Sequence, residues 1–95
     1  MVINELKPLE QHIFEVQSER LTRIILKEET IAVPRGTYTI ITEAPIEGLI
    51  LYAFYNKQNS LLGSDTVTGT KQDYNRLIQH CRKSFYLKPE SPQDT

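Results

Sequence analysis

A seven-residue apolar run, Leu49 to Tyr55 (LILYAFY), constrains the fold of this chain more than any other segment. The run is far shorter than the roughly 20 residues with which a helix spans a bilayer. Because it is apolar at both odd and even positions, it predicts a strand that is covered on both faces, by the rest of the chain or by a second copy. We therefore expect residues 49–56 to form a central strand, and we expect no membrane partner.

Other β-prone segments flank this run. Alternating or β-branched residues predict strands over 20–27, 30–33, 37–43 and 61–67, the last with a bulge at Gly63. Pro34 and Gly36 predict a type I turn over 33–36, and the polar segment 57–60 predicts a hairpin connection. Connections this short exclude parallel crossovers, so the sheet is expected to be mostly antiparallel.

The strongest helical pattern comes late in the chain. Five apolar residues share one helical face, namely Tyr74, Leu77, Ile78, Cys81 and Phe85. Thr70 and Asp73 have the spacing of a capping box, in which the Thr hydroxyl and the Asp carboxylate bond each other's backbone N–H groups. The pattern predicts a helix from Lys71 to about Phe85.

The N-terminal segment allows two interpretations. Leu6, Leu9, Ile13 and Val16 have the 3, 4, 3 spacing of a helical face, which predicts a helix over 6–16. Phe14 interrupts that face, and the alternative is a strand that begins over 13–16. We favour the helix on the spacing.

Together these elements predict an α+β fold. We expect an antiparallel sheet of four to five strands, a C-terminal helix packed on one sheet face and an N-terminal helix. The 95 residues leave room for one domain, over 1–87. Residues 88–95 contain two prolines and no large apolar side chain, so they are expected to form a mobile tail.

Composition narrows the function classes. Eleven Lys plus Arg against twelve Asp plus Glu give a net charge of −1, so no overall field attracts nucleic acid or an anionic membrane. The single cysteine excludes an internal disulfide, and the first residues lack the pattern of a signal peptide. These features favour a protein of the reducing cytoplasm.

One loop could hold a small anionic ligand or nucleotide. The stretch from Ser64 to Lys71 is rich in hydroxyls and glycine and runs from a strand into a helix, whose first N–H groups favour a negative group. It departs from the nucleotide P-loop, because five residues separate Gly63 from Gly69 and Thr70 precedes the lysine. The alternative is a β-prone strand followed by a helix cap. The candidate ligand-binding residues are Ser64, Thr68, Gly69, Thr70, Lys71 and Arg76.

A second candidate surface would bind a protein. Tyr52 and Phe54 could lie on a sheet face that one helix does not fully cover, and Arg76, Arg82 and Lys83 could form a basic helix face. The alternatives are core packing for the aromatics and an ordinary solvated face for the cations. Nucleic acid is a less favoured partner for the basic face than another protein or a second copy of this chain.

No constellation for catalysis is recognisable. Cys81 lies on the apolar helical face, where a thiol behaves as a small hydrophobe, and His80 beside it points about 100° away. The two histidines and one cysteine lack metal-ligand spacing. We therefore predict no catalytic residues, metal or cofactor, and interpret the chain as a non-catalytic binding or regulatory module that contacts another protein or itself.

Overall fold

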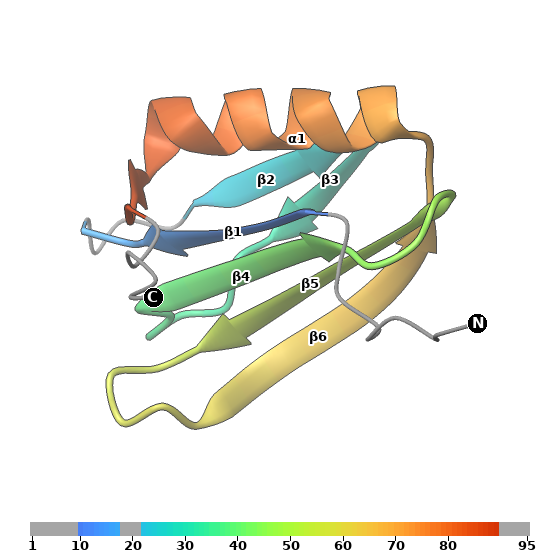
Figure 1. The fold of residues 1–95 in the computed structure, drawn as a ribbon. Helices are drawn as coiled ribbons and strands as arrows, with labels where there is room; N and C mark the ends of the chain where they lie inside the picture. The colour runs from blue at the N-terminus through green and yellow to red at the C-terminus, as the bar shows by residue number, and fades with distance from the viewer. Residues whose placement is uncertain (1–9, 18–21, 90–95) are drawn as a thin grey trace, which may run out of the picture.

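The computed structural model describes residues 10–17 and 22–89, which form an antiparallel five-stranded sheet, a two-stranded hairpin and one helix (Figure 1). The sheet has the strand order β6-β5-β4-β1-β7. Its strands are β1 (Glu10–Glu15), β4 (Thr39–Ala44), β5 (Leu49–Tyr55), β6 (Leu61–Thr68) and β7 (Tyr86–Leu87). This arrangement confirms the predicted α+β class.

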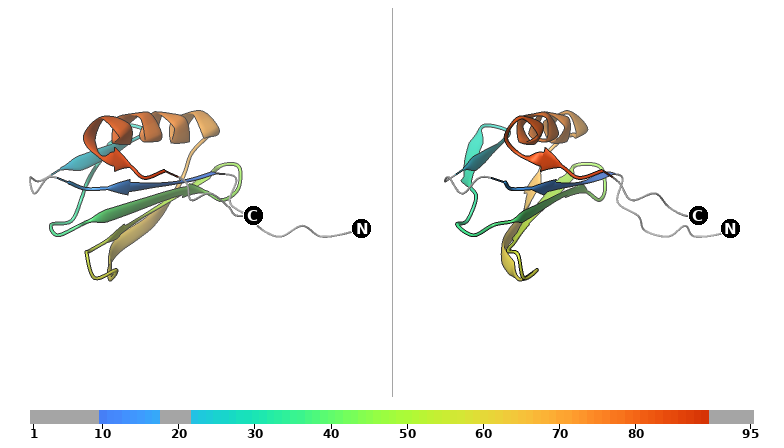
Figure 2. Two further views of the ribbon diagram at one scale, coloured as in Figure 1. Left: turned by 60° about the vertical axis from the view of Figure 1, so that its left-hand side comes forward. Right: turned by 90° about the vertical axis from the view of Figure 1, so that its left-hand side faces the viewer.

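The helix and the hairpin lie on the same side of the large sheet (Figure 2). The hairpin consists of β2 (Arg23–Leu26) and β3 (Glu29–Ala32), and the helix α1 covers Lys71–Ser84. We call the sheet face beneath them the inner face and the opposite one the outer face. The hairpin pairs with no strand of the large sheet in the part of the chain that the structure describes.

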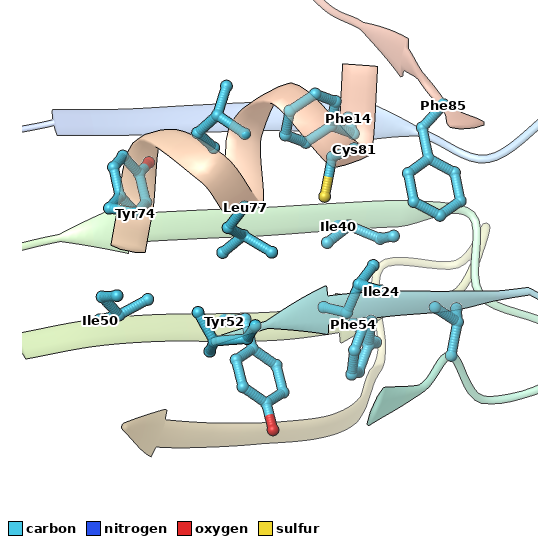
Figure 3. Close-up of a cluster of buried hydrophobic side chains, with 13 residues drawn as sticks. Phe14, Ile24, Ile40, Ile50, Tyr52, Phe54, Tyr74, Leu77, Cys81 and Phe85 are labelled. Atoms are coloured by element: carbon cyan, nitrogen blue, oxygen red, sulfur yellow. The ribbon is translucent and has the colours of Figure 1, made fainter. Parts of the chain in front are cut away.

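The hydrophobic core fills the space between the inner face and these two elements (Figure 3). The helix contributes the predicted apolar face, in which Tyr74, Leu77, Ile78 and Cys81 are buried. Alternate residues of β2, β4 and β5 are buried in the core, as the period of two in a strand requires. The remaining core residues are Phe14, Ile24, Leu26, Val33, Ile40, Ile50, Tyr52, Phe54 and Phe85.

The predicted N-terminal helix is absent from residues 10–16, the described part of the segment in which it was expected. Residues 10–15 form β1, which pairs with β4 from Glu10↔Ala44 to Glu15↔Thr39. Phe14, which interrupts the helical spacing, is fully buried because it is a core position of this strand. The strand alternative is therefore correct, although β1 begins earlier than Ile13. Residues 6–9 of the predicted helix lie outside the described residues.

One of the two predicted turns differs in detail from its prediction. The turn after β3 spans Pro34–Thr37, one residue later than predicted, since the Thr37 N–H donates to the Pro34 carbonyl at 3.2 Å. Gly36 is therefore the third residue of the turn, with φ of 89°, which is the property of a type II turn. The β5–β6 hairpin has the predicted irregularity beside Gly63, where Leu62 is an extra residue between the pairs Phe54↔Gly63 and Tyr55↔Leu61.

The short strand that follows the helix was not predicted. Phe85 caps α1, and β7 then pairs with β1 through Phe14↔Leu87 and Glu15↔Tyr86. The Lys88 N–H donates to the Ile13 carbonyl at 2.9 Å, so the first residue of the predicted mobile tail is bonded to the sheet. Residues 90–95 of that tail lie outside the described range.

Candidate functional site

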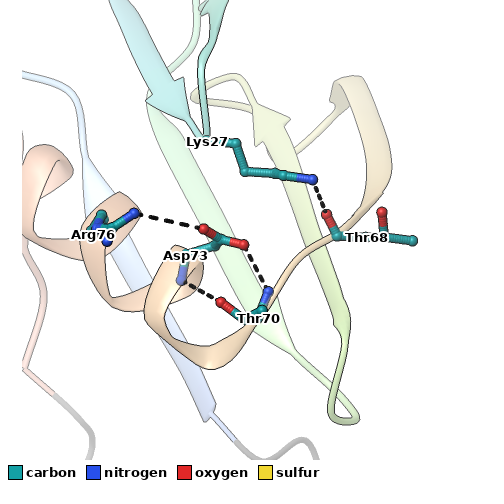
Figure 4. A network of polar contacts seen from close by, with 5 residues as sticks. All are labelled: Lys27, Thr68, Thr70, Asp73 and Arg76. Atoms are coloured by element: carbon teal, nitrogen blue, oxygen red, sulfur yellow. Dashed lines mark hydrogen bonds and ion pairs between the residues drawn. The ribbon is translucent and has the colours of Figure 1, made fainter.

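The predicted ligand loop forms a helix cap. The Thr70 hydroxyl accepts from the Asp73 N–H at 3.1 Å, and the Asp73 carboxylate accepts from the Thr70 N–H at 2.8 Å (Figure 4). The hydrogen bond from the Thr70 backbone is the main reason why the pKa of Asp73 is lowered from its ordinary value. A negative carboxylate therefore already occupies the helix N-terminus, where an anionic ligand would have to bind.

The candidate ligand residues do not converge on one point. Thr70 and Lys71 border a cavity of about 140 Å³, whereas Ser64 and Thr68 project from β6, where they pair with Ala53 and Leu49 of β5. The exposed Arg76 lies 3.9 Å from Asp73, one turn into the helix.

The small cavity beside Lys71 has mixed character. Its walls are largely apolar, but they include Glu10, whose Oε1 is buried and has no hydrogen-bond partner in the described part of the chain. A carboxylate oxygen of this kind disfavours an anion. Gly69 also borders the cavity, and a Cβ there would come within 2.7 Å of Ile50 Cδ1. The glycine is therefore required by close packing against the core.

The structure separates the candidate partner-binding residues. Tyr52 and Phe54 are only 7% and 3% exposed, because they face the helix and hairpin as part of the core. They offer almost no surface to a partner, which corrects their placement on an open face. Arg76, Arg82 and Lys83 are all exposed on α1, so the basic surface exists without the aromatics that were expected to complement it.

The outer face of the sheet was missed as a candidate site. Its centre is a row of three apolar residues on adjacent strands, Ile13, Ile41 and Ala53, which the register places side by side. Leu51 and Tyr55 extend the row along β5, and all five side chains are partly exposed. None of the described elements covers them, because α1 and the hairpin lie on the inner side (Figure 2). The apolar character of both faces of β5 was the signal in the sequence, and the alternation assigns Leu51, Ala53 and Tyr55 to the open side.

A larger cleft of about 950 Å³ lies at the end of the sheet near the β5–β6 turn. Tyr38 and Glu15 form part of its wall, and the Tyr38 hydroxyl donates to Glu15 Oε2 at 2.8 Å. This hydrogen bond is the main cause of the raised pKa of Tyr38. Lys57 lies 5.7 Å from the centre of the same ring. These groups are engaged with one another, and we assign them no reaction.

The histidines and the cysteine are not arranged for nucleophilic catalysis. His12 Nδ1 lies 3.0 Å from the Tyr74 hydroxyl, and His80 Nε2 lies 3.5 Å from the Arg23 carbonyl oxygen. Cys81 is fully buried, and burial raises the pKa of its thiol to about 12. Within residues 10–17 and 22–89, no group of three or more His, Cys, Asp or Glu side chains could hold a metal ion.

The thiol of Cys81 should therefore react only when the protein unfolds. We expect an aromatic disulfide reagent at pH 8 to modify the native protein slowly and the protein in denaturant within seconds, because only the unfolded chain presents an accessible thiolate. The measurement follows the absorbance of the aromatic thiolate that the reagent releases, with and without denaturant. Equally fast modification of the native protein would contradict the burial of this side chain.

Comparisons with known proteins return no family model, curated protein or solved structure that matches this chain. In the described residues, no helix is long and apolar enough to cross a membrane.

Proposed function

We propose that this chain is a non-catalytic protein-interaction module whose contact surface is the outer face of the five-stranded sheet. The observation that supports the proposal is the apolar row Ile13–Ile41–Ala53, extended by Leu51 and Tyr55 and left uncovered by the described elements. Contiguous apolar surface of this kind is typical of protein–protein contacts. A cytoplasmic location suits the single free, buried cysteine.

The charged residues around this surface favour a protein partner over nucleic acid. Glu15 and Glu43 project from the outer face, and Gln11 donates to Glu43 Oε2 at 2.6 Å. Carboxylates repel a phosphate backbone, whereas a protein can cover the apolar row and leave the carboxylates at the rim in water.

A photo-crosslinking amino acid placed at Leu51 tests the proposal. We expect it to form one adduct of defined mass in an extract of the source cells, because the partner covers this side chain. The same amino acid at Gln79, which is exposed on α1, should form none. Adducts are resolved by gel and identified by mass spectrometry.

The adduct must also depend on the apolar row. Ile41→Lys, placed in the chain that carries the crosslinker at Leu51, should abolish it, and thermal unfolding must show that this variant still folds. Equal labelling from Leu51 and Gln79, or an adduct that survives Ile41→Lys, would refute a specific contact at this face.

A further inference from the structure

Among the strands that the structure describes, the edge strand β6 has an unpaired side to which a further strand could bind. It is the longest strand of the sheet, and it pairs on one side with β5. No strand in the described part of the chain pairs with its other side, as Figure 1 shows at the edge of the sheet. An open edge of this length is a template for another strand.

The direction of the backbone groups along β6 follows from the ladder with β5. The Gly69 N–H donates to the Gly48 carbonyl at 3.0 Å, and hydrogen-bonded pairs recur at every second residue. Val67, Asp65 and Gly63 therefore bond to β5, whereas Ser64, Thr66 and Thr68 direct their N–H and C=O groups away from the sheet.

Two hydrogen bonds agree with this assignment. The Thr66 N–H donates to the carboxylate of its neighbour Asp65 at 2.8 Å, and the Thr68 carbonyl accepts from Lys27 Nζ of the hairpin at 3.2 Å. Neither group is therefore used by β5. Within the described residues, the outward-facing Ser64 has no hydrogen bond of this kind.

The side chains of β6 leave the edge open. The strand contains no Lys, Arg or Pro, which commonly protect edge strands, and Asp65 is its single charged residue. Leu61 and Leu62 are 56% and 38% exposed at its beginning. Threonine and valine at its other end favour pairing with a further strand.

We propose that β6 pairs antiparallel with β6 of a second copy of this chain, with Ser64 opposite Ser64 of the other copy. The pairing adds a second contact to the proposed interaction module: it uses the β6 edge and leaves the outer face of the same sheet open. Leu61 and Leu62 of each strand then lie beside Val67 and Thr66 of the other, so one contact covers the exposed leucines of both copies. The two sheets become one continuous sheet across a two-fold axis.

Charge selects this register over the next one. A pairing centred on Asp65 would set the two carboxylates directly opposite each other, and like charges so placed are destabilising. In the Ser64-centred register, Asp65 lies opposite Gly63 of the other copy, which has no side chain. The Thr66 N–H exchanges its bond to Asp65 for a backbone carbonyl.

The contact with the hairpin disfavours the third register. A pairing centred on Thr66 would place Thr68 opposite Ser64 of the other copy and would require the Thr68 carbonyl. That carbonyl already accepts from Lys27. The Ser64-centred register leaves this bond in place.

A cysteine scan of the edge tests both the pairing and its register. Each of Ser64→Cys, Asp65→Cys and Thr66→Cys is oxidised mildly in the full chain and analysed on a non-reducing gel. Residues opposite each other in a hydrogen-bonded pair have Cα atoms about 5.5 Å apart, which suits a disulfide, whereas Asp65 would lie about 7–8 Å diagonally from its copy. Gln79→Cys on the exposed helix face measures random collision, and the buried Cys81 is common to all variants.

We expect Ser64→Cys to crosslink at least tenfold faster than the other three variants, and the unmodified protein to sediment as a dimer at about 100 µM. Faster crosslinking of Asp65→Cys or Thr66→Cys would overturn the register. A monomer in sedimentation, with Ser64→Cys no faster than Gln79→Cys, would overturn the pairing. The Leu51 adduct does not depend on this pairing, so its formation in that case would leave the proposed outer-face contact standing.

Discussion

Replacement of Ile24 by Ala should lower the free energy of unfolding by about 2–5 kcal/mol, whereas Ile25→Ala should lower it by less than about 1 kcal/mol. The two residues are neighbours on β2 and lose the same atoms. Ile24 is fully buried beneath α1, and Ile25 is 44% exposed on the other side of the hairpin. Denaturant titration followed by circular dichroism measures both changes.

This pair of variants tests whether the hairpin is an integral part of the core. The hairpin shares no backbone ladder with the large sheet in the described residues, so side-chain packing of Ile24 and Leu26 and the bond from Lys27 to Thr68 hold it in place. Equal costs for Ile24→Ala and Ile25→Ala would mean that the hairpin is not docked against the helix.

Tyr74→Phe should cost about 1–3 kcal/mol of stability, although it removes a single oxygen atom. The Tyr74 hydroxyl donates to the Thr42 carbonyl at 3.2 Å and lies 3.1 Å from Thr42 Oγ1 and 3.0 Å from His12 Nδ1. Without it, polar groups of Thr42 and His12 lose their shared partner in a site with little access to water. Tyr86→Phe is the matched control, because Tyr86 is exposed and its loss should be nearly neutral.

The cost of Tyr74→Phe should shrink at alkaline pH. Burial raises the pKa of Tyr74 from 10.0 to about 12, so the unfolded chain loses this proton first. The stabilising effect of the neutral phenol is complete below pH 10 and is lost as the pH rises towards 12. Denaturant titrations at pH 8 and pH 11 should therefore give a smaller difference between wild type and variant at the higher pH. A difference that grew instead would contradict the burial of a neutral phenol.

The sequence specified those elements whose signals are local. The helical face of Tyr74, Leu77 and Cys81, the cap formed by Thr70 and Asp73, and the β5–β6 turn all depend on residues close together in the chain. Their bounds could be predicted to within a few residues, because each signal lies inside the element that it defines.

The missed elements depend on distant partners. The helical spacing of Ile13 and Val16 is overridden because β1 pairs with β4 and β7 on its two sides. The strand β7 is only two residues long, which is too short to show a sequence pattern. It forms because it pairs with β1. Local reasoning also could not decide which face of β5 is covered, so both an open face and core packing remained possible for Tyr52 and Phe54. The structure buries these two side chains and leaves Leu51 and Tyr55 partly exposed.

The position of β1 between β4 and β7 constrains the order in which the fold can be completed. The first strand lies between β4 and β7, and β7 is the last element of the described chain. During synthesis, β4, β5 and β6 can form successive hairpins as they emerge, whereas β1 must wait for β4 on one side and for β7, which follows the helix, on the other. We therefore expect the N-terminal strand to become protected from hydrogen exchange late in folding, and a ribosome-bound chain that stops before β7 to hold β1 by one edge alone.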